Sequence, residues 1–69
     1  MKNRLDKLRT NRKWTQQDLA DHLDVSRQTI ISLEQGRYNP SLLLAFRISQ
    51  VFGLSIEEIF IREEEKGNG

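Results

Sequence analysis

The sequence predicts a small all-α protein of five short helices. Residues that favour helix N-caps precede four of the five segments of periodic apolar residues, and glycines stand where two of the helices would end. Between these signals the apolar residues recur at intervals of three and four, which is the period of a helix and not of a strand. The N-cap candidates are Thr15, Ser26, Ser41 and Ser55, and the stop candidates are Gly36 and Gly53.

Length and composition limit the class of protein. A chain of 69 residues buries only about 60% of its unfolded surface, so we expect one domain over residues 1–69 with a small core over about 4–60, and oligomerisation as a source of extra stability. The absence of Cys excludes disulfides, thiolate metal sites and a cysteine nucleophile. No apolar run approaches the roughly 20 residues of a membrane span, and the N-terminus lacks the apolar stretch of a secretory signal. We therefore expect a soluble cytoplasmic protein with no metal and no cofactor.

Charge is distributed unevenly along the chain. Residues 1–40 carry eight Lys or Arg against five Asp or Glu, whereas residues 41–69 carry three against five. The first part therefore has a modest positive field, which favours a phosphate backbone. Uneven charge is also common on ordinary protein surfaces, so charge alone leaves both interpretations open.

The first two helices are short and amphipathic. Leu5 and Leu8 give the first helix a narrow apolar stripe in a basic segment, and we expect it to end near Arg12 or Lys13. The second helix should begin at Gln16, because Thr15 is a good N-cap and an acidic residue three positions later completes a capping-box pattern. Its expected buried face consists of Leu19, Ala20 and Leu23.

The remaining helices follow from the same signals. Ser26 comes so soon after Leu23 that the third helix, about residues 27–35, must cross the second steeply. Ile30 and Leu33 should face inward, and Gly36 should adopt a left-handed conformation after the helix. A fourth helix is expected between Ser41 and Gly53, with buried Leu44, Ile48 and Val51. A short fifth helix after Ser55 carries Ile56, Ile59 and Phe60, and an acidic tail covers residues 61–69.

A helix, a tight turn and a second helix with polar residues at its start are typical of proteins that insert a helix into the DNA major groove. Arg donates to the guanine edge, Gln pairs with adenine, and Thr offers a hydroxyl or a methyl group. The outward face of the third helix carries residues spaced by three and four, including an apolar Ile that could contact a thymine methyl. The predicted base-contacting residues are Arg27, Gln28, Thr29, Ile31 and Ser32.

Contacts with phosphates are expected at helix ends and in loops. Gln16 lies at the start of the second helix, where free backbone N–H groups favour an anion. The residues that follow the third helix are placed to hold a second phosphate, and Arg12 with Lys13 would add a third unless they are merely solvated charges. The predicted phosphate-binding residues are Gln16, Arg12, Gln35, Arg37 and Asn39.

Four spaced segments make the sequence resemble a known family. They are TQQDLA at 15–20, VSRQTI at 25–30, LEQG at 33–36 and NPS at 39–41. Together they resemble the Cro/C1-type helix-turn-helix family, also called the XRE family, of phage repressors and small bacterial regulators. The resemblance covers about residues 4–60. It implies a five-helix, lambda repressor-like domain that binds operator DNA, usually as a two-fold dimer, and therefore double-stranded DNA as the partner.

The resemblance also implies roles for individual residues. The family's base-contacting positions fall on Arg27, Gln28 and Ser32, and its phosphate-contacting Gln falls on Gln16. The family often pairs an Arg of the first helix with the Glu before the Gly that follows the third helix. Here that structural ion pair would join Arg9 and Glu34, and it would either tie the two helices together or lie on the surface. Trp14 departs from the pattern, because the family usually has a smaller aliphatic residue there.

The chain ends and the dimer contact are less constrained. In some very short members of the family the chain ends form a small β-element or a dimer contact, and here Glu63–Glu65 could meet the basic N-terminal residues; a disordered acidic tail is the alternative. For the homodimer we expect the fifth helix, together with the end of the fourth, to form the interface. The predicted interface residues are Leu54, Ile56, Ile59 and Phe60, some of which could instead belong to the core.

The same sequence bears on two other possible functions, an enzyme and a protein-interaction module. An enzyme is not expected, and no catalytic residue is proposed, because the one His, His22, has no Cys or carboxylate cluster to act with it. A protein-interaction module, such as an antitoxin-like partner or an adaptor, is the alternative to a regulator, which is expected to be a repressor. From the length of the chain we expect no separate small-molecule effector domain.

Overall fold

The elements of the fold follow the predicted order. In a computed structural model that describes residues 2–61, the described part of the chain contains five helices and two short strands. The helices are α1 (Leu5–Asn11), α2 (Gln16–Leu23), α3 (Arg27–Glu34), α4 (Leu42–Phe52) and α5 (Ile56–Ile59), and the strands are β1 (Lys2–Asn3) and β2 (Phe60–Ile61). The all-α prediction with a small β-element is confirmed.

Side-chain caps explain where the helices begin. Thr15 Oγ1 accepts a hydrogen bond from the backbone N–H of Asp18, and the Asp18 carboxylate accepts one from the N–H of Thr15. Ser55 and Glu58 form the same reciprocal capping box at the start of α5. Ser26 and Ser41 cap α3 and α4 through single hydrogen bonds. Each cap satisfies N–H groups that have no partner within the helix, so the capping residue fixes the first turn.

Helix ends differ slightly from the prediction. The first helix ends at Asn11, with Arg12 as its C-cap. The third ends at Glu34 because Gln35 is its C-cap, and Gly36 follows with a φ of 75°. Gly53 ends α4 with a φ of 66°, in the left-handed region where glycine is favoured.

The two strands join the beginning and the end of the described chain. They pair antiparallel, with Lys2 opposite Ile61 and Asn3 opposite Phe60. The Asn3 amide also donates to the backbone carbonyl of Leu33 over 2.7 Å. The first strand is thereby attached both to β2 and to the end of α3. The predicted contact of Glu63–Glu65 with the N-terminal residues lies outside the described residues.

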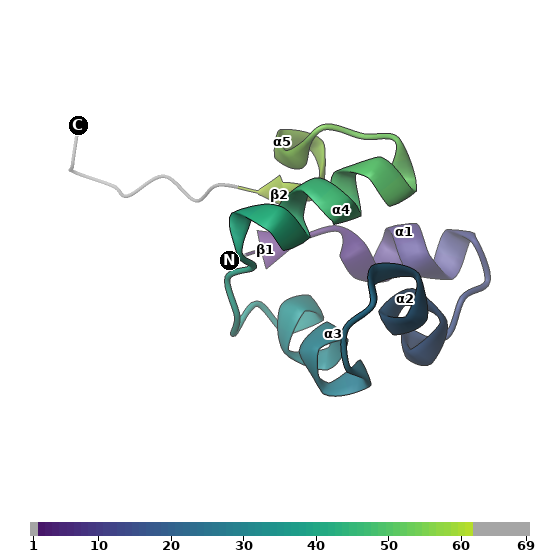
Figure 1. Ribbon diagram of the computed structural model, residues 1–69. Coiled ribbons are helices and arrows are strands. Elements are labelled where there is room, and N and C mark those ends of the chain that lie inside the picture. The colour runs from purple at the N-terminus through teal and green to yellow at the C-terminus, as the bar shows by residue number, and fades with distance from the viewer. Residues whose placement is uncertain (1, 62–69) are drawn as a thin grey trace, which may run out of the picture.

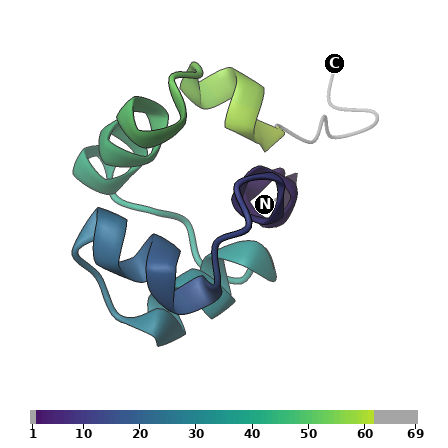
Figure 2. The same ribbon diagram turned by 90° about the vertical axis from the view of Figure 1, so that its right-hand side faces the viewer.

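The core lies between two groups of helices. Figures 1 and 2 show α2 and α3 on one side of α1, and α4 and α5 on the other. The largest side chains that are fully buried come from each of these helices: Leu5, Leu19, Leu23, Ile30, Leu33, Ile48 and Ile59. Burying each contributes about 1.5–3 kcal/mol, so the orientation of α2 and α3 depends on packing against the rest of the protein. None of the helices in the described part is both long and apolar enough to cross a membrane.

Candidate nucleic-acid interface

The turn between α2 and α3 is short and well defined. Asp24 ends α2 with φ 59° and ψ 46°, the left-handed conformation. The N–H of Val25 then donates to the carbonyl of Ala20 over 3.0 Å, and Ser26 already caps α3. Val25 is half-buried and packs against the core. Three residues therefore change the chain direction and fix the angle between the two helices.

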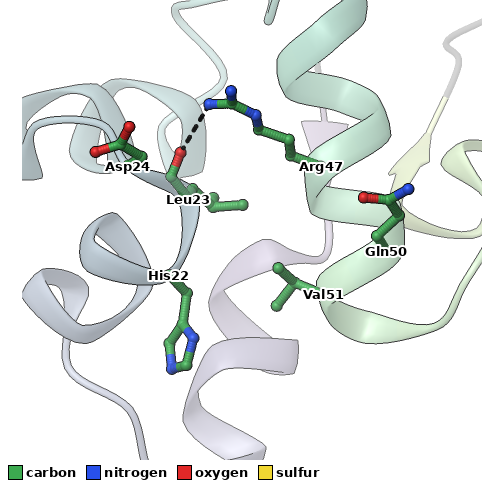
Figure 3. A pocket seen from close by; sticks show the side chains of 6 residues that line it. All are labelled: His22, Leu23, Asp24, Arg47, Gln50 and Val51. Atoms are coloured by element: carbon green, nitrogen blue, oxygen red, sulfur yellow. Dashed lines mark hydrogen bonds between the residues drawn. The ribbon is translucent and has the colours of Figure 1, made fainter.

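A side chain from α4 supports this turn. Figure 3 shows the Arg47 guanidinium reaching across a shallow pocket to the carbonyl of Leu23, to which its Nη1 donates over 3.4 Å. A cation at the C-terminal end of α2 also interacts favourably with the helix dipole. His22 lies in the same lining, and its ring stacks on Trp14 with centroids 4.1 Å apart. His22 is exposed, and it contributes packing to the outer surface of α2.

The third helix has one buried and one accessible face. Ile30 and Leu33 are fully buried, so the opposite face points outward. In its first turn Arg27 and Gln28 are exposed, and Thr29 is half-buried with its hydroxyl 2.9 Å from Ser26 Oγ. The predicted residues one turn later, Ile31 and Ser32, are half-buried. Arg27 and Gln28 are therefore the most accessible of the five, while the hydroxyl of Thr29 already takes part in the N-cap.

Candidate phosphate contacts lie at both ends of this unit. Gln16 is the first residue of α2, and Gln35, Arg37 and Asn39 are exposed after α3. A hydrogen bond orients the Gln16 amide, because its Nε2 donates to Glu34 Oε1 over 3.2 Å. One N–H of that amide and the first backbone N–H groups of α2 remain to meet an anion.

Arg12 makes internal contacts that its predicted role in phosphate binding did not include. Its Nη1 donates to the carbonyl of Val51 over 3.0 Å, and its guanidinium carbon lies 5.1 Å from the Trp14 ring centroid and 4.9 Å from that of Phe52. These contacts hold the side chain against the end of α4 instead of beside Gln16. Arg12 therefore packs between the α1–α2 connection and α4, and a phosphate contact by this exposed residue stays a prediction.

The ion pair between Arg9 and Glu34 joins three segments. Arg9 Nε donates to Glu34 Oε2 over 2.7 Å, and the two side chains are only 12% and 9% exposed. Arg9 Nη1 also donates to the carbonyl of Trp14 over 2.8 Å. The hydrogen bond to Glu34 is the main cause that raises the pKa of Arg9 above its ordinary value. With the Gln16 contact included, one carboxylate at the end of α3 holds both α1 and the start of α2.

Two residues of the predicted dimer interface are unsuitable. Ile59 is 0% and Phe60 8% exposed, because both fill the core of the single chain. The prediction is wrong for these two residues, since a second chain could reach them only after the core had repacked. Leu54 and Ile56 are half-buried and pack against the same core.

The accessible apolar side chains lie elsewhere. Leu42, Leu43 and Phe46, on the first half of α4, are 69%, 61% and 51% exposed. Sequence reasoning missed them because it followed the inward face of this helix alone. The available signal was that all five positions of 42–46 are apolar, which is more than one helix face can bury.

Comparison with known proteins agrees with this geometry. A family model described as "Helix-turn-helix" matches residues 5–59. An HTH-type transcriptional regulator from Methanocaldococcus jannaschii is 54% identical over 66 residues, which cover 96% of this chain and 100% of the relative. The immunity repressor protein of Bacillus phage phi105 is 34% identical over 67 residues, covering 90% of this chain and 46% of that protein.

A solved structure has the same arrangement of elements. The restriction-modification controller protein of Aeromonas hydrophila is 27% identical, with a TM-score of 0.71, and the match covers 80% of this chain and 83% of that one.

Proposed function

We propose that this chain, which belongs to the Cro/C1-type helix-turn-helix (XRE) family of DNA-binding transcriptional regulators, represses transcription by binding a palindromic operator as a homodimer. Members of this family are regulators and not enzymes. The observation that carries the proposal is the exposure of Arg27 and Gln28 in the first turn of α3, directly after a three-residue turn. A helix start with these two side chains matches the major-groove edges of guanine and adenine.

Base contacts are assigned by accessibility. Arg27 donates two hydrogen bonds to one guanine, and Gln28 pairs with an adenine through one donor and one acceptor. Ile31 and Ser32 lie one turn later and are half-buried, so they contact bases only where α3 lies deep in the groove. Thr29 contributes its methyl group, since its hydroxyl is held by Ser26.

Backbone contacts flank the groove-binding helix. Gln16 binds a phosphate together with the N-terminal N–H groups of α2, and Gln35, Arg37 and Asn39 bind another from the loop after α3. Their exposure and their place at the two ends of the helix-turn-helix support this assignment. These contacts position α3 without specifying sequence.

A two-fold symmetric dimer binds best to an operator that is itself palindromic. Each protomer of a two-fold dimer binds one half-site, and the centres of the two half-sites lie about 34 Å apart, one turn of the duplex. The small core of a 69-residue chain supports the dimer, because a second copy buries additional apolar surface. We infer that the protein acts on DNA in the cytoplasm, with residues 1–69 as one domain.

Repression is the proposed sign of regulation. It is supported by the 34% identity to a phage immunity repressor and by the simplicity of the mechanism, since a dimer on an operator blocks polymerase without a further domain. A promoter reporter that carries the selected operator tests it. Reporter output should fall when the protein is expressed, and a rise would identify an activator.

The decisive experiment is selection of bound duplexes from a randomised DNA library at near-physiological salt. We expect an enriched inverted repeat whose half-site centres lie about one helical turn apart. The double variant Arg27→Ala, Gln28→Ala should lose the sequence preference. Its matched control, Lys7→Ala, Gln50→Ala, removes a cation and an amide from exposed positions on α1 and α4 and should select the same sequence as the parent.

The same experiment separates the second candidate function, a protein-interaction module. DNA binding through several phosphates weakens steeply as salt rises, whereas an apolar protein contact is nearly indifferent to salt. If no sequence is enriched and retention ignores salt, the regulator proposal fails and the apolar surface of α4 becomes the site to examine.

A further inference from the structure

Helix α4 carries apolar side chains on two faces. Its inward face packs Leu44, Ala45, Ile48 and Phe52 into the core, each 7% exposed or less. The other apolar side chains of its first half, which we call the α4 patch, are Leu42, Leu43 and Phe46, and they are 51–69% exposed. Because Phe46 follows Leu42 by four residues and Leu43 by three, the three side chains neighbour one another on the helix surface.

The α4 patch is local and sharply bounded. Arg47 and Gln50 follow it on the exposed surface of the same helix, so the apolar surface ends after Phe46. The loop before the helix carries another exposed aromatic side chain, Tyr38, which is 42% exposed. A helix whose apolar residues extend beyond its buried face is typical of a helix that packs against two neighbours.

The charge of this segment indicates what the second neighbour is. Residues 38–46 contain no charged side chain, although 30% of the residues in the whole chain are charged. In a two-fold dimer a residue at the dyad meets its own copy, so a single charge placed there would face an equal charge. An uncharged apolar patch avoids this repulsion, whereas DNA would require cations at the same place.

Its position also suits the proposed operator complex. Figure 1 shows the loop from the end of α3 to the start of α4 running along one side of the molecule, with α3 at one end of that loop and α4 at the other. Because this loop leaves the end of α3, a dyad beside the start of α4 lies toward that end of the helix and not toward its exposed first turn. The fifth helix offers less apolar surface, because Ile59 is fully buried and Ile56 is half-buried.

We infer that Leu42, Leu43 and Phe46 form the isologous contact between two copies of this chain. The inference rests on the proposed homodimer and replaces the interface expected on α5. Because the patch is small, the dimer dissociates on dilution, and protein concentration then controls how much operator-competent dimer exists.

Sedimentation velocity over a range of protein concentrations tests the contact. The parent chain should change from monomer to dimer as concentration rises. Leu43→Glu places a charge against its own copy and should raise the dimer dissociation constant at least about tenfold. Gln50→Glu adds the same charge to an exposed position of the same helix outside the patch and should leave the constant unchanged. Circular dichroism shows whether each variant is folded.

Cysteine cross-linking gives a second test that does not disturb the packing by charge. The chain has no Cys, so Leu42→Cys, Leu43→Cys and Phe46→Cys each introduce a single thiol. At least one of the three should form a disulfide-linked dimer under mild oxidation, because equivalent residues approach each other near a dyad. Gln50→Cys and Ile56→Cys serve as controls and should remain largely monomeric on a denaturing gel.

The outcomes separate this inference from the proposed function. A parent chain that stays monomeric at every concentration, or a dimer that Leu43→Glu leaves intact, overturns the inference even if the library yields a specific DNA sequence. A dimer that Leu43→Glu disrupts and a patch cysteine cross-links supports it, even if no DNA sequence is selected. A cross-link through Ile56→Cys alone would move the interface to α5 and would also overturn it.

Discussion

Gly53 shows how one residue sets the end of a helix. Its φ of 66° closes α4, and a methyl group added at its Cα would meet no atom within 4 Å. Replacement by alanine therefore tests backbone conformation without steric clash. The left-handed conformation is unfavourable for L-residues with a side chain, and Asn tolerates it better than Ala.

We expect Gly53→Ala to lower the free energy of unfolding by about 1 kcal/mol. In a domain of this size that corresponds to a fall in Tm of roughly 4–8 °C. Urea and thermal unfolding measure both quantities. Gly53→Asn should lower the free energy of unfolding by less than Gly53→Ala does. Equal losses for the two variants would show that backbone strain is not the cause of the destabilisation.

The capping carboxylate of Asp18 predicts a dependence of stability on pH. Its acceptance of the Thr15 N–H lowers the pKa of Asp18 below its ordinary value. A carboxyl whose pKa is lower in the folded state stabilises the protein above the unfolded-state pKa of about 4, and this stabilisation is lost as pH falls through the folded-state pKa. Glu58 has the same contact with Ser55, and its pKa is lowered for the same reason.

We therefore expect Asp18→Asn to make the free energy of unfolding less dependent on pH on the acid side. The parent and the variant should differ most near pH 7 and converge as the pH is lowered below the ordinary carboxyl range. Unfolding curves between pH 7 and pH 2.5 measure the difference. A constant gap across that range would mean that the carboxylate charge is not what the cap requires.

At the scale of elements, the Glu34 carboxylate at the end of α3, the proposed base-contacting helix, is linked to α1 and to the start of α2, where a phosphate contact is proposed. It accepts hydrogen bonds from Arg9 on α1 and from Gln16 on α2. Arg9 also balances the charge of this carboxylate. The pair is largely removed from solvent, so loss of one partner leaves an uncompensated charge, which is more costly than losing both.

We expect Arg9→Gln to lower the free energy of unfolding by about 3 kcal/mol. Adding Glu34→Gln should recover part of that loss, giving a coupling energy of about 1–3 kcal/mol in a double-mutant cycle. Urea unfolding of the four proteins provides the cycle. Additive effects of the two substitutions would show that the pair behaves as two independent surface charges.

At the scale of the whole molecule, the proposed binding to DNA depends on Lys and Arg side chains, which are distributed unevenly along the chain. Arg37 is exposed in the loop after α3, and it is a proposed phosphate contact that makes no base contact. We expect Arg37→Gln to weaken binding to the operator and to unrelated DNA by similar factors. The slope of log K against log salt should become shallower by about 1 for each protomer bound.

Fluorescence anisotropy with labelled operator and scrambled duplexes, over a series of salt concentrations, measures both effects. Gln50→Ala, on the exposed surface of α4, is the control and should change neither the affinity nor the slope. A loss of affinity for the operator alone would reassign Arg37 to base recognition.

The sequence by itself determined the local features of this protein. Caps at Thr15, Ser26, Ser41 and Ser55 and the stop at Gly53 depend on hydrogen bonds and backbone conformations within a few residues, so the pattern of residues predicts them. The outward face of α3 followed from its period in the same way. The pairing of Arg9 with Glu34 came from family resemblance, because no local pattern relates residues 25 positions apart.

Only the tertiary structure decided which apolar side chains are buried in the core and which charged side chains make contacts within the chain. Ile59 and Phe60 fill the core, Arg12 lies against the end of α4, and Leu42 with Leu43 stays exposed. Periodicity shows that a helix has an apolar face, but burial depends on which other helix covers that face. That choice results from the packing of all the helices around one small core, and no segment of the sequence contains it alone.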